Sequence, residues 1–247
     1  RLDDPATAAS EIARVLRECR EQSRPVLIEI PRDITFVDGG EPVTLPPTPY
    51  SEEAVQNCAD NVLQRLQQAD NPMLLVGVEI RRFQLEDKVA ELALRLNVPV
   101  ATTFMGRGLL ADSDAPLAGT YVGMAGNKEV QELVENSDGL LMLGVIISDT
   151  NFGISAKRVA EQHAIHANDR DVKVGFHYYH NVPLSALLDA LLEKAEQLDP
   201  EAAPYAFPKP VHPGLTIDDS PIKPLDIAGA VNDMMRTHGT LPIASDM

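Results

Sequence analysis

Two hydrophobic periods alternate along most of this chain. Short apolar runs typical of buried parallel strands occur at Met73–Val78, Val98–Thr102, Gly139–Leu143, His163–Ala167 and Val172–Phe176. Apolar residues at helical spacing predict helices before, between and after them, at residues 51–69, 85–96, 128–136, 155–161 and 184–192. Residues 119–126 and 177–180 fit neither pattern, and we predict loops there. This alternation predicts an α/β fold, a Rossmann-like, doubly wound, mostly parallel sheet with helices on both faces.

Shorter pieces flank this region on both sides. Before it, helical spacing runs from Pro5 to Cys19, with Asp4 as N-cap, and a strand is predicted at Val26–Ile30. After it, a helix is predicted at Leu225–Met235 and the start of a strand at Leu241–Ala244. A lone helix and strand cannot bury their own apolar faces, so we interpret both pieces as incomplete parts of neighbouring domains.

Proline-rich stretches separate the three regions and act as linkers. The predicted boundaries are a first piece at 1–35, a linker at 36–50, a central domain at 51–197, a second linker at 198–223 and a last piece at 224–247.

The charge and composition of the chain limit the classes of function that we expect for it. The 247 residues include 37 acidic and 21 basic side chains, a formal net charge of -16. This charge repels phosphate, which argues against nucleic acid and anionic membranes as partners. No apolar run approaches the ~20 residues of a membrane helix, and no signal peptide opens the sequence, so we expect a cytoplasmic protein. The two cysteines, Cys19 and Cys58, lie in helical patterns and are expected to be reduced, partly buried thiols.

The most informative polar positions follow two of the predicted strands. Arg81 and Arg82 follow the first strand, and the segment Ser148-Asp-Thr-Asn151 follows the strand at 139–143. Because parallel strands end at one edge of a sheet, we expect Arg81 or Arg82 to meet Asp149 across a crevice there. The simpler alternative is a solvated arginine pair without a special role. The candidate rim residues are therefore Arg81, Asp149, Thr150 and Asn151.

Other motifs carry little chemistry. The glycine-rich stretches at 106–108 and 119–126 are not Gly-x-Gly-x-x-Gly turns that open a helix, and tight turns explain them. The pairs His163/His166 and His177/His180 have no accompanying ligands at metal-site spacing, and we interpret them as structural. No nucleophile motif occurs. We therefore assign no catalytic, cofactor-binding or metal-binding residue.

Four stretches resemble thiamine diphosphate-dependent 2-keto acid decarboxylases. The stretch from Arg24 to Asp33 (RPVLIEIPRD) is similar to the closing strand of that family's pyrimidine-binding domain. Residues 98–108 (VPVATTFMGRG) and 139–151 (GLLMLGVIISDTN) are similar to its central domain, and 243–246 (IASD) to the first strand of its diphosphate-binding domain. These stretches are most similar to the phenylpyruvate and indolepyruvate decarboxylase branch, and the resemblance covers nearly the whole chain.

The resemblance implies a parent enzyme that decarboxylates an aryl- or indole-substituted 2-keto acid with thiamine diphosphate and Mg²⁺. In that family the catalytic glutamate belongs to the first domain and the Gly-Asp-Gly…Asn motif to the third. Neither motif occurs here, so we expect the chain to be inactive by itself. Its implied partners are the pyrimidine- and diphosphate-binding domains, in a homodimer or homotetramer. The resemblance further suggests that Asp149 and Thr150, with Arg81, relay substrate binding or loop closure.

Two other functions remain open at this point. The crevice of some relatives holds FAD or an ADP moiety, which makes a nucleotide-binding module the alternative. The segment Thr102-Thr-Phe-Met105 argues against a dinucleotide, because no acidic ribose partner stands there. FAD is therefore not expected. The other possibility is a purely structural spacer whose crevice binds nothing.

Overall fold

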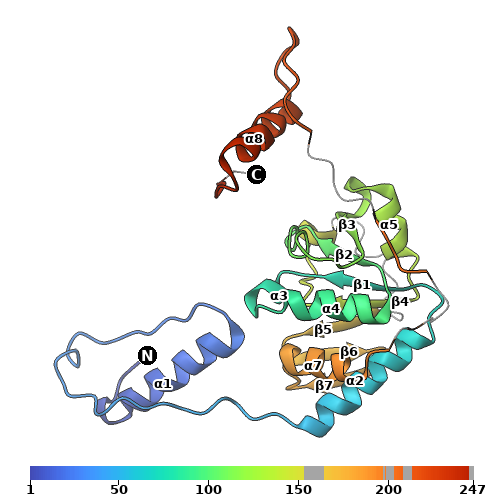
Figure 1. Cartoon of the computed structure of the whole chain (residues 1–247). Coiled ribbons are helices and arrows are strands. Elements are labelled where there is room, and N and C mark those ends of the chain that lie inside the picture. Colours follow the sequence, from blue (N-terminus) through green and yellow to red (C-terminus); the bar gives the residue numbers. More distant parts are fainter. Residues whose placement is uncertain (153–163, 197, 199–202, 208–212, 245–247) are drawn as a thin grey trace. The chain divides into compact units, whose positions relative to one another are not determined.

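The structure is a computed structural model that describes residues 1–152, 164–196, 198, 203–207 and 213–244. The chain divides into two compact units, residues 1–206 and 207–247 (Figure 1). The first unit holds one large sheet with its helices and the preceding amino-terminal helix. The second holds a single helix within the described residues.

The described residues form a seven-stranded sheet in the order β3-β2-β1-β4-β5-β6-β7. The strands are β1 (Pro72–Val76), β2 (Val100–Thr103), β3 (Leu117–Tyr121), β4 (Gly139–Leu143), β5 (Ala164–Asn168), β6 (Asp171–Val174) and β7 (His177–His180). The five strands from β3 to β5 pair in parallel, and β6 and β7 continue the sheet antiparallel. The predicted mostly parallel, Rossmann-like α/β fold is therefore confirmed.

Helices cover both faces of this sheet (Figure 1). They are α2 (Glu52–Gln67), α3 (Glu79–Arg82), α4 (Glu86–Leu96), α5 (Lys128–Glu135), α6 (Asp149–Phe152) and α7 (Leu184–Lys194), with a 3₁₀ turn at Gly123–Ala125. Alternate residues of β1 serve the two faces, since Leu74 and Val76 pack with α2, α4 and α7, whereas Met73 and Leu75 pack with α5. Both faces are apolar because both are covered, which explains the continuous apolar runs of the central strands.

The predicted helix starts depend on local capping. The side chain of Ser51 accepts a hydrogen bond from the Ala54 amide at 3.2 Å and begins α2. Asp4 does the same for Ala6 at 3.0 Å and begins α1 (Pro5–Gln22), as predicted. In the second unit, α8 (Pro224–His238) begins where the Asp226 carboxylate accepts a hydrogen bond from the Lys223 amide at 2.7 Å.

Two predicted strands are wrong. Neither Val26–Ile30 nor Leu241–Ala244 is a strand. A strand needs a partner for its backbone groups, and around the first segment the structure has only the bond from the Leu2 amide to the Glu29 carbonyl, at 2.9 Å, among the described residues. Leu27 is accordingly 81% exposed.

Two predicted loops are also wrong. The stretch 119–126 contains the end of β3, where Gly119 adopts a φ of 142° beside a register shift against β2. Residues 177–180 form β7, because Gly175, at a φ of 59°, turns the chain back onto β6. The strand predicted to Phe176 ends at Val174 for the same reason. The helix predicted at 155–161 lies outside the described residues.

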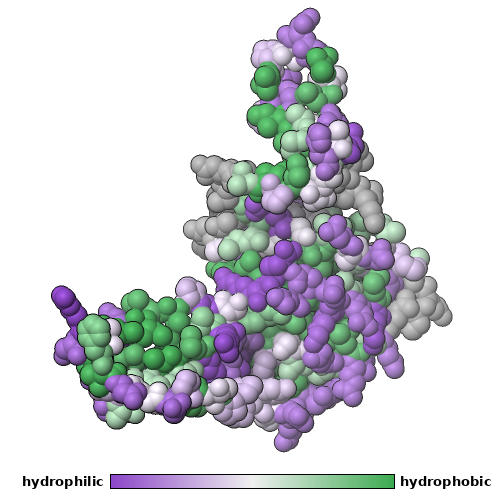
Figure 2. Space-filling model, turned by 60° about the vertical axis from the view of Figure 1, so that its left-hand side comes forward, coloured by the Kyte–Doolittle hydropathy of each residue, from purple (hydrophilic) through white to green (hydrophobic). Residues whose placement is uncertain are grey.

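Apolar surface is concentrated outside the central domain. Figure 2 shows large hydrophobic areas on the amino-terminal segment, while hydrophilic residues cover much of the central domain. The exposed apolar residues of this segment include Val26, Leu27, Ile30, Phe36 and Val37. The second unit exposes Ile217, Ile222, Leu225 and Ile227. Among the described residues, no helix has the length and apolar character needed to cross a membrane.

The two cysteines differ in burial. Cys58 lies on α2 with no exposed surface, and this burial raises the pKa of its thiol to about 12. Cys19 lies half-buried on α1, and both are free thiols.

We predict that only Cys19 reacts with a thiol reagent in the folded protein at pH 8. Cys58 stays protonated and out of contact with the reagent, and the thiolate is the reactive form. Counting released chromophore with Ellman's reagent checks this, with Cys19→Ser as the control. Rapid reaction of two thiols without denaturant would contradict the burial of Cys58.

Candidate functional site

The candidate site lies at the carboxyl edge of β1 and β4. These neighbouring strands occupy the switch point of the sheet, because the chain leaves β1 toward β2 and leaves β4 toward β5 on the other side. Ligand crevices of doubly wound sheets form where connections diverge in this way. Arg81, Asp149 and Asn151 all come from segments that follow these two strands.

At the switch point the two strand ends touch through glycines. A Cβ on Gly77 would lie only 2.1 Å from the Gly144 carbonyl oxygen, and Gly144 itself has a φ of 61°. The Gly77 amide donates to Leu143 O at 2.8 Å, and the Glu79 amide donates to Gly144 O at 3.2 Å. These amides are the groups that would cradle a phosphate, and they are already satisfied. The local geometry therefore does not favour the nucleotide-binding alternative.

Glu79 places a buried carboxylate directly above these glycines. Its side chain is only 7% exposed, and its Oε2 accepts a hydrogen bond from the Asp169 amide at 3.3 Å. Its Oε1 lies 3.8 Å from an Arg82 nitrogen and 3.9 Å from an Arg24 nitrogen. Glu79 was not predicted from the sequence, although an acidic residue three positions after a buried strand was an available signal.

The two arginines after β1 have different partners. Arg82 faces Glu79, whereas the Nε of Arg81 lies 2.6 Å from Glu86 Oε1, at the start of α4. The Arg81 side chain is 61% exposed. Asp149 and Thr150 form the first turn of α6, but their side chains lie outside what the structure describes. A contact between Arg81 and Asp149 therefore stays a prediction.

Asn151 joins two loops of the rim. It is fully buried, and its Oδ1 accepts a hydrogen bond from the Met105 amide at 3.1 Å. Its Nδ2 donates to the Ile146 carbonyl at 2.7 Å. The loop after β2 is thus tied to the loop after β4, which makes Asn151 a structural member of the rim. Nearby, the buried Ser148 Oγ has no hydrogen-bond partner among the described residues, and a bound polar group would satisfy such an atom.

The described residues do not fit a magnesium–diphosphate site. Within them, no group of three histidine, cysteine or acidic residues is arranged to hold a metal. His180 lies 3.1 Å from Asp171 on the exposed β6–β7 hairpin, and His163 lies outside the described residues. The donor set that Mg²⁺ and a diphosphate require is not assembled in this part of the chain.

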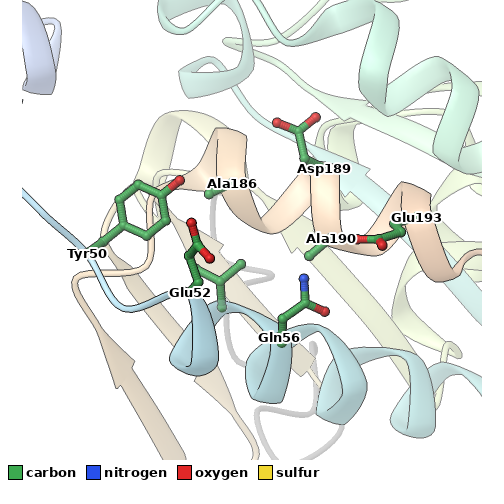
Figure 3. A pocket seen from close by; sticks show the side chains of 8 residues that line it. Tyr50, Glu52, Gln56, Ala186, Asp189, Ala190 and Glu193 are labelled. Carbon is green, nitrogen blue, oxygen red and sulfur yellow. The ribbon is translucent and has the colours of Figure 1, made fainter.

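The groove between α2 and α7 is a poor candidate for an anionic substrate. It has a volume of about 250 Å³, and Figure 3 shows Glu52 and Gln56 of α2 across from Asp189 and Glu193 of α7. Its lining has three carboxylates and no basic side chain. Asp189 is paired with Lys88 at 2.6 Å, outside the lining. A 2-keto acid or diphosphate would be repelled by such a groove.

Comparison with known protein families agrees with this geometry. Residues 59–195 match the family described as thiamine pyrophosphate enzyme, central domain. The chain belongs to this family. The matched residues run from α2 to just past the end of α7 and so cover the whole seven-stranded sheet.

Curated relatives extend the similarity. The chain is 51% identical to indole-3-pyruvate decarboxylase of Azospirillum brasilense over 252 aligned residues, which cover 100% of this chain and 45% of that protein. It is 30% identical to a pyruvate decarboxylase of Aspergillus terreus over 78% of this chain and 35% of that protein. It is 28% identical to pyruvate decarboxylase isozyme 1 of Saccharomyces cerevisiae over 84% of this chain and 38% of that protein. The chain spans less than half the length of these relatives.

We predict that Asn151→Ala destabilises this thiamine pyrophosphate enzyme central domain by about 1–3 kcal/mol, because a buried amide and a carbonyl lose their partners. Urea unfolding followed by circular dichroism measures the free energy of unfolding. Asn136→Ala, at an exposed position after α5, is the matched control and should change it by less than about 0.5 kcal/mol. Equal effects of the two substitutions would show that Asn151 does not hold the rim.

Proposed function

We propose that this chain is the central region of a thiamine diphosphate-dependent decarboxylase for indole- or aryl-substituted 2-keto acids. The observation that carries the proposal is the 51% identity to indole-3-pyruvate decarboxylase along the whole chain. Identity to the pyruvate decarboxylases is much lower, at 30% or below for the relatives compared above. The larger substrate class is therefore favoured over pyruvate.

The proposed role of this chain is to support the active site and not to supply its chemistry. At the rim the Glu79 carboxylate and the strand-end amides are satisfied within the protein, and the described residues hold no group of three side chains arranged for a metal. We propose that thiamine diphosphate and Mg²⁺ are held by the pyrimidine- and diphosphate-binding domains. No catalytic step is assigned to any residue of this chain.

The proposed organisation follows from the same assignment. Residues 1–35 close the pyrimidine-binding domain, 51–197 form the central domain and 224–247 open the diphosphate-binding domain, with linkers at 36–50 and 198–223. The exposed apolar residues of the flanking segments support this, because apolar surface of this kind is normally covered by further protein. A cytoplasmic homodimer or homotetramer is the assembly we propose for the complete enzyme.

The rim is the proposed place where this domain influences the reaction. Arg81, Asp149, Thr150 and Asn151 follow two strands that end side by side, and Asn151 ties the loop after β2 to the loop after β4. The unsatisfied Ser148 hydroxyl beside them is a further polar group for a ligand. We propose that Asp149 and Thr150, with Arg81, respond to substrate by favouring one state of the rim loops.

We predict that the 247-residue chain alone binds neither the cofactor nor a nucleotide. Calorimetric titration with thiamine diphosphate plus Mg²⁺, with ADP and with FAD should give no binding tighter than about 1 mM. Tight binding of thiamine diphosphate would show that this region holds the cofactor itself. Binding of ADP or FAD would restore the nucleotide-binding alternative.

We predict that a complete enzyme containing this chain decarboxylates indole-3-pyruvate with a kcat/KM higher than that for pyruvate. In the same enzyme, Asp149→Ala should change the substrate concentration that gives half-maximal rate by about fivefold or more, because the response of the rim to substrate is removed. Steady-state rates of CO₂ release measure both quantities. A preference for pyruvate would reject the substrate class, and unchanged kinetics of Asp149→Ala would reject the rim role alone.

A further inference from the structure

Arg170 occupies a rigid turn between β5 and β6. Its φ of 61° lies in the left-handed region, and its backbone is fixed by two bonds, from its own amide to Val182 O at 3.0 Å and from the Asn181 amide to its carbonyl at 2.7 Å. A non-glycine residue in this conformation persists only when its surroundings hold it. The guanidinium of Arg170 therefore projects from a fixed point of the central domain.

The guanidinium reaches groups of three different segments. Its Nη2 lies 3.6 Å from Glu21 Oε2, at the end of α1, and its Nε lies 3.9 Å from the neighbouring Asp169 carboxylate. Its Nη1 donates a hydrogen bond to the Asn181 side chain, just after β7. The side chains of Arg170, Glu21 and Asp169 are only 24%, 16% and 14% exposed. Solvent therefore screens these charges less than it screens an ordinary surface pair.

Glu21 and Asn181 each extend this contact to the end of the 36–50 segment. The Glu21 carboxylate accepts hydrogen bonds from the Thr48 amide at 2.6 Å and the Thr48 hydroxyl at 2.7 Å. Burial by itself raises the pKa of Glu21, but these two bonds and the charges of Arg170 and Arg17 lower it overall. The side-chain Nδ2 of Asn181 donates a hydrogen bond to the Pro49 carbonyl at 2.9 Å.

A second set of contacts lies one turn further along the chain. The Ser23 hydroxyl donates to the Arg82 carbonyl at 3.3 Å, and Arg24 lies 3.9 Å from Glu79. Glu79 in turn accepts from the Asp169 amide, next to Arg170. The end of α1 is thus connected to the turn at 169–170 through two independent sets of side chains.

We propose that Arg170 is the centre of an ionic clamp that fixes the end of α1 and the end of the 36–50 segment to the central domain. The segment is then a fixed connector over its last residues and not a flexible tether. In a larger enzyme, the clamp makes the amino-terminal piece and the central domain move together. The clamp comprises the side chains of Glu21, Thr48, Asp169, Arg170 and Asn181, and it does not depend on the reaction that we propose for the whole enzyme.

The simpler alternative is a set of surface ion pairs that do not hold the segments together, since exposed ion pairs contribute little to stability. Two features argue against it. The three charged members are partly buried, and Arg170 and Glu21 each have at least two partners from different segments. A network of this kind is lost as a unit when its central charge is removed, whereas isolated pairs are lost one at a time.

Hydrogen exchange of the 247-residue chain, read by mass spectrometry over peptides that contain residues 43–50 and 169–181, tests the clamp. Arg170→Gln should accelerate exchange of the Thr48 amide by about three- to tenfold, because Glu21 is no longer held in place. Glu21→Gln should accelerate it at least as much, and the double variant should exchange no faster than Glu21→Gln alone. Arg14→Gln is the matched control, because Arg14 pairs only with Glu11 within α1 among the described contacts.

Unchanged exchange at Thr48 in Arg170→Gln, or fully additive effects in the double variant, would overturn the clamp. If Arg170→Gln unfolds the central domain, Glu21→Gln decides by itself, since Glu21 lies outside that domain. If the clamp exists, Glu21→Gln accelerates hydrogen exchange at the backbone amides of Arg170 and Asn181 as well as at that of Thr48. A change confined to Thr48 would show a local contact between α1 and the linker only.

Discussion

The close approach of β1 and β4 is the constraint on which the rest of the structure depends. Gly77 and Gly144 let the two strand ends meet backbone to backbone, and no side chain would fit between them. This contact closes the switch point with the protein's own hydrogen bonds and places Glu79 over it. In doubly wound folds ligands commonly bind beside this position.

Several polar side chains of this domain hold its loops and neighbouring segments in place. Asn151 ties two rim loops, Glu79 and Asp169 bond to backbone amides, and Arg170 holds segments that come from outside the sheet. Burial raises the pKa of Asp169, and the bond from the Leu184 amide and the charges of Arg170 and Arg24 oppose this rise. Such buried polar groups specify one arrangement of loops and neighbours, because leaving any of them unpaired costs free energy.

This architecture supports the role that we propose, a central domain that positions two further domains. A spacer of that kind needs stiffness at its edges and controlled attachment to what precedes and follows it. The apolar central strands β1 and β4 supply the first requirement, since Leu74, Leu75 and Leu141 have no exposed surface. The Arg170 clamp supplies the second on the amino-terminal side. The rim at Ser148 to Asn151 is the part of the domain that we propose responds to a ligand.

The sequence by itself determined the fold class and most helices and central strands, because their apolar periods are strong and local. It located β4 at Gly139–Leu143, the N-cap at Asp4 and the start of α2 at Ser51. Only the tertiary structure decided which segments become strands at the edges, since pairing requires a partner that no local pattern reveals. Val26–Ile30 lacks one, while His177–His180 gains one from β6. The partners of Glu79, Asn151 and Arg170 were likewise decided in three dimensions, because they join residues as far as 149 positions apart that only folding brings together.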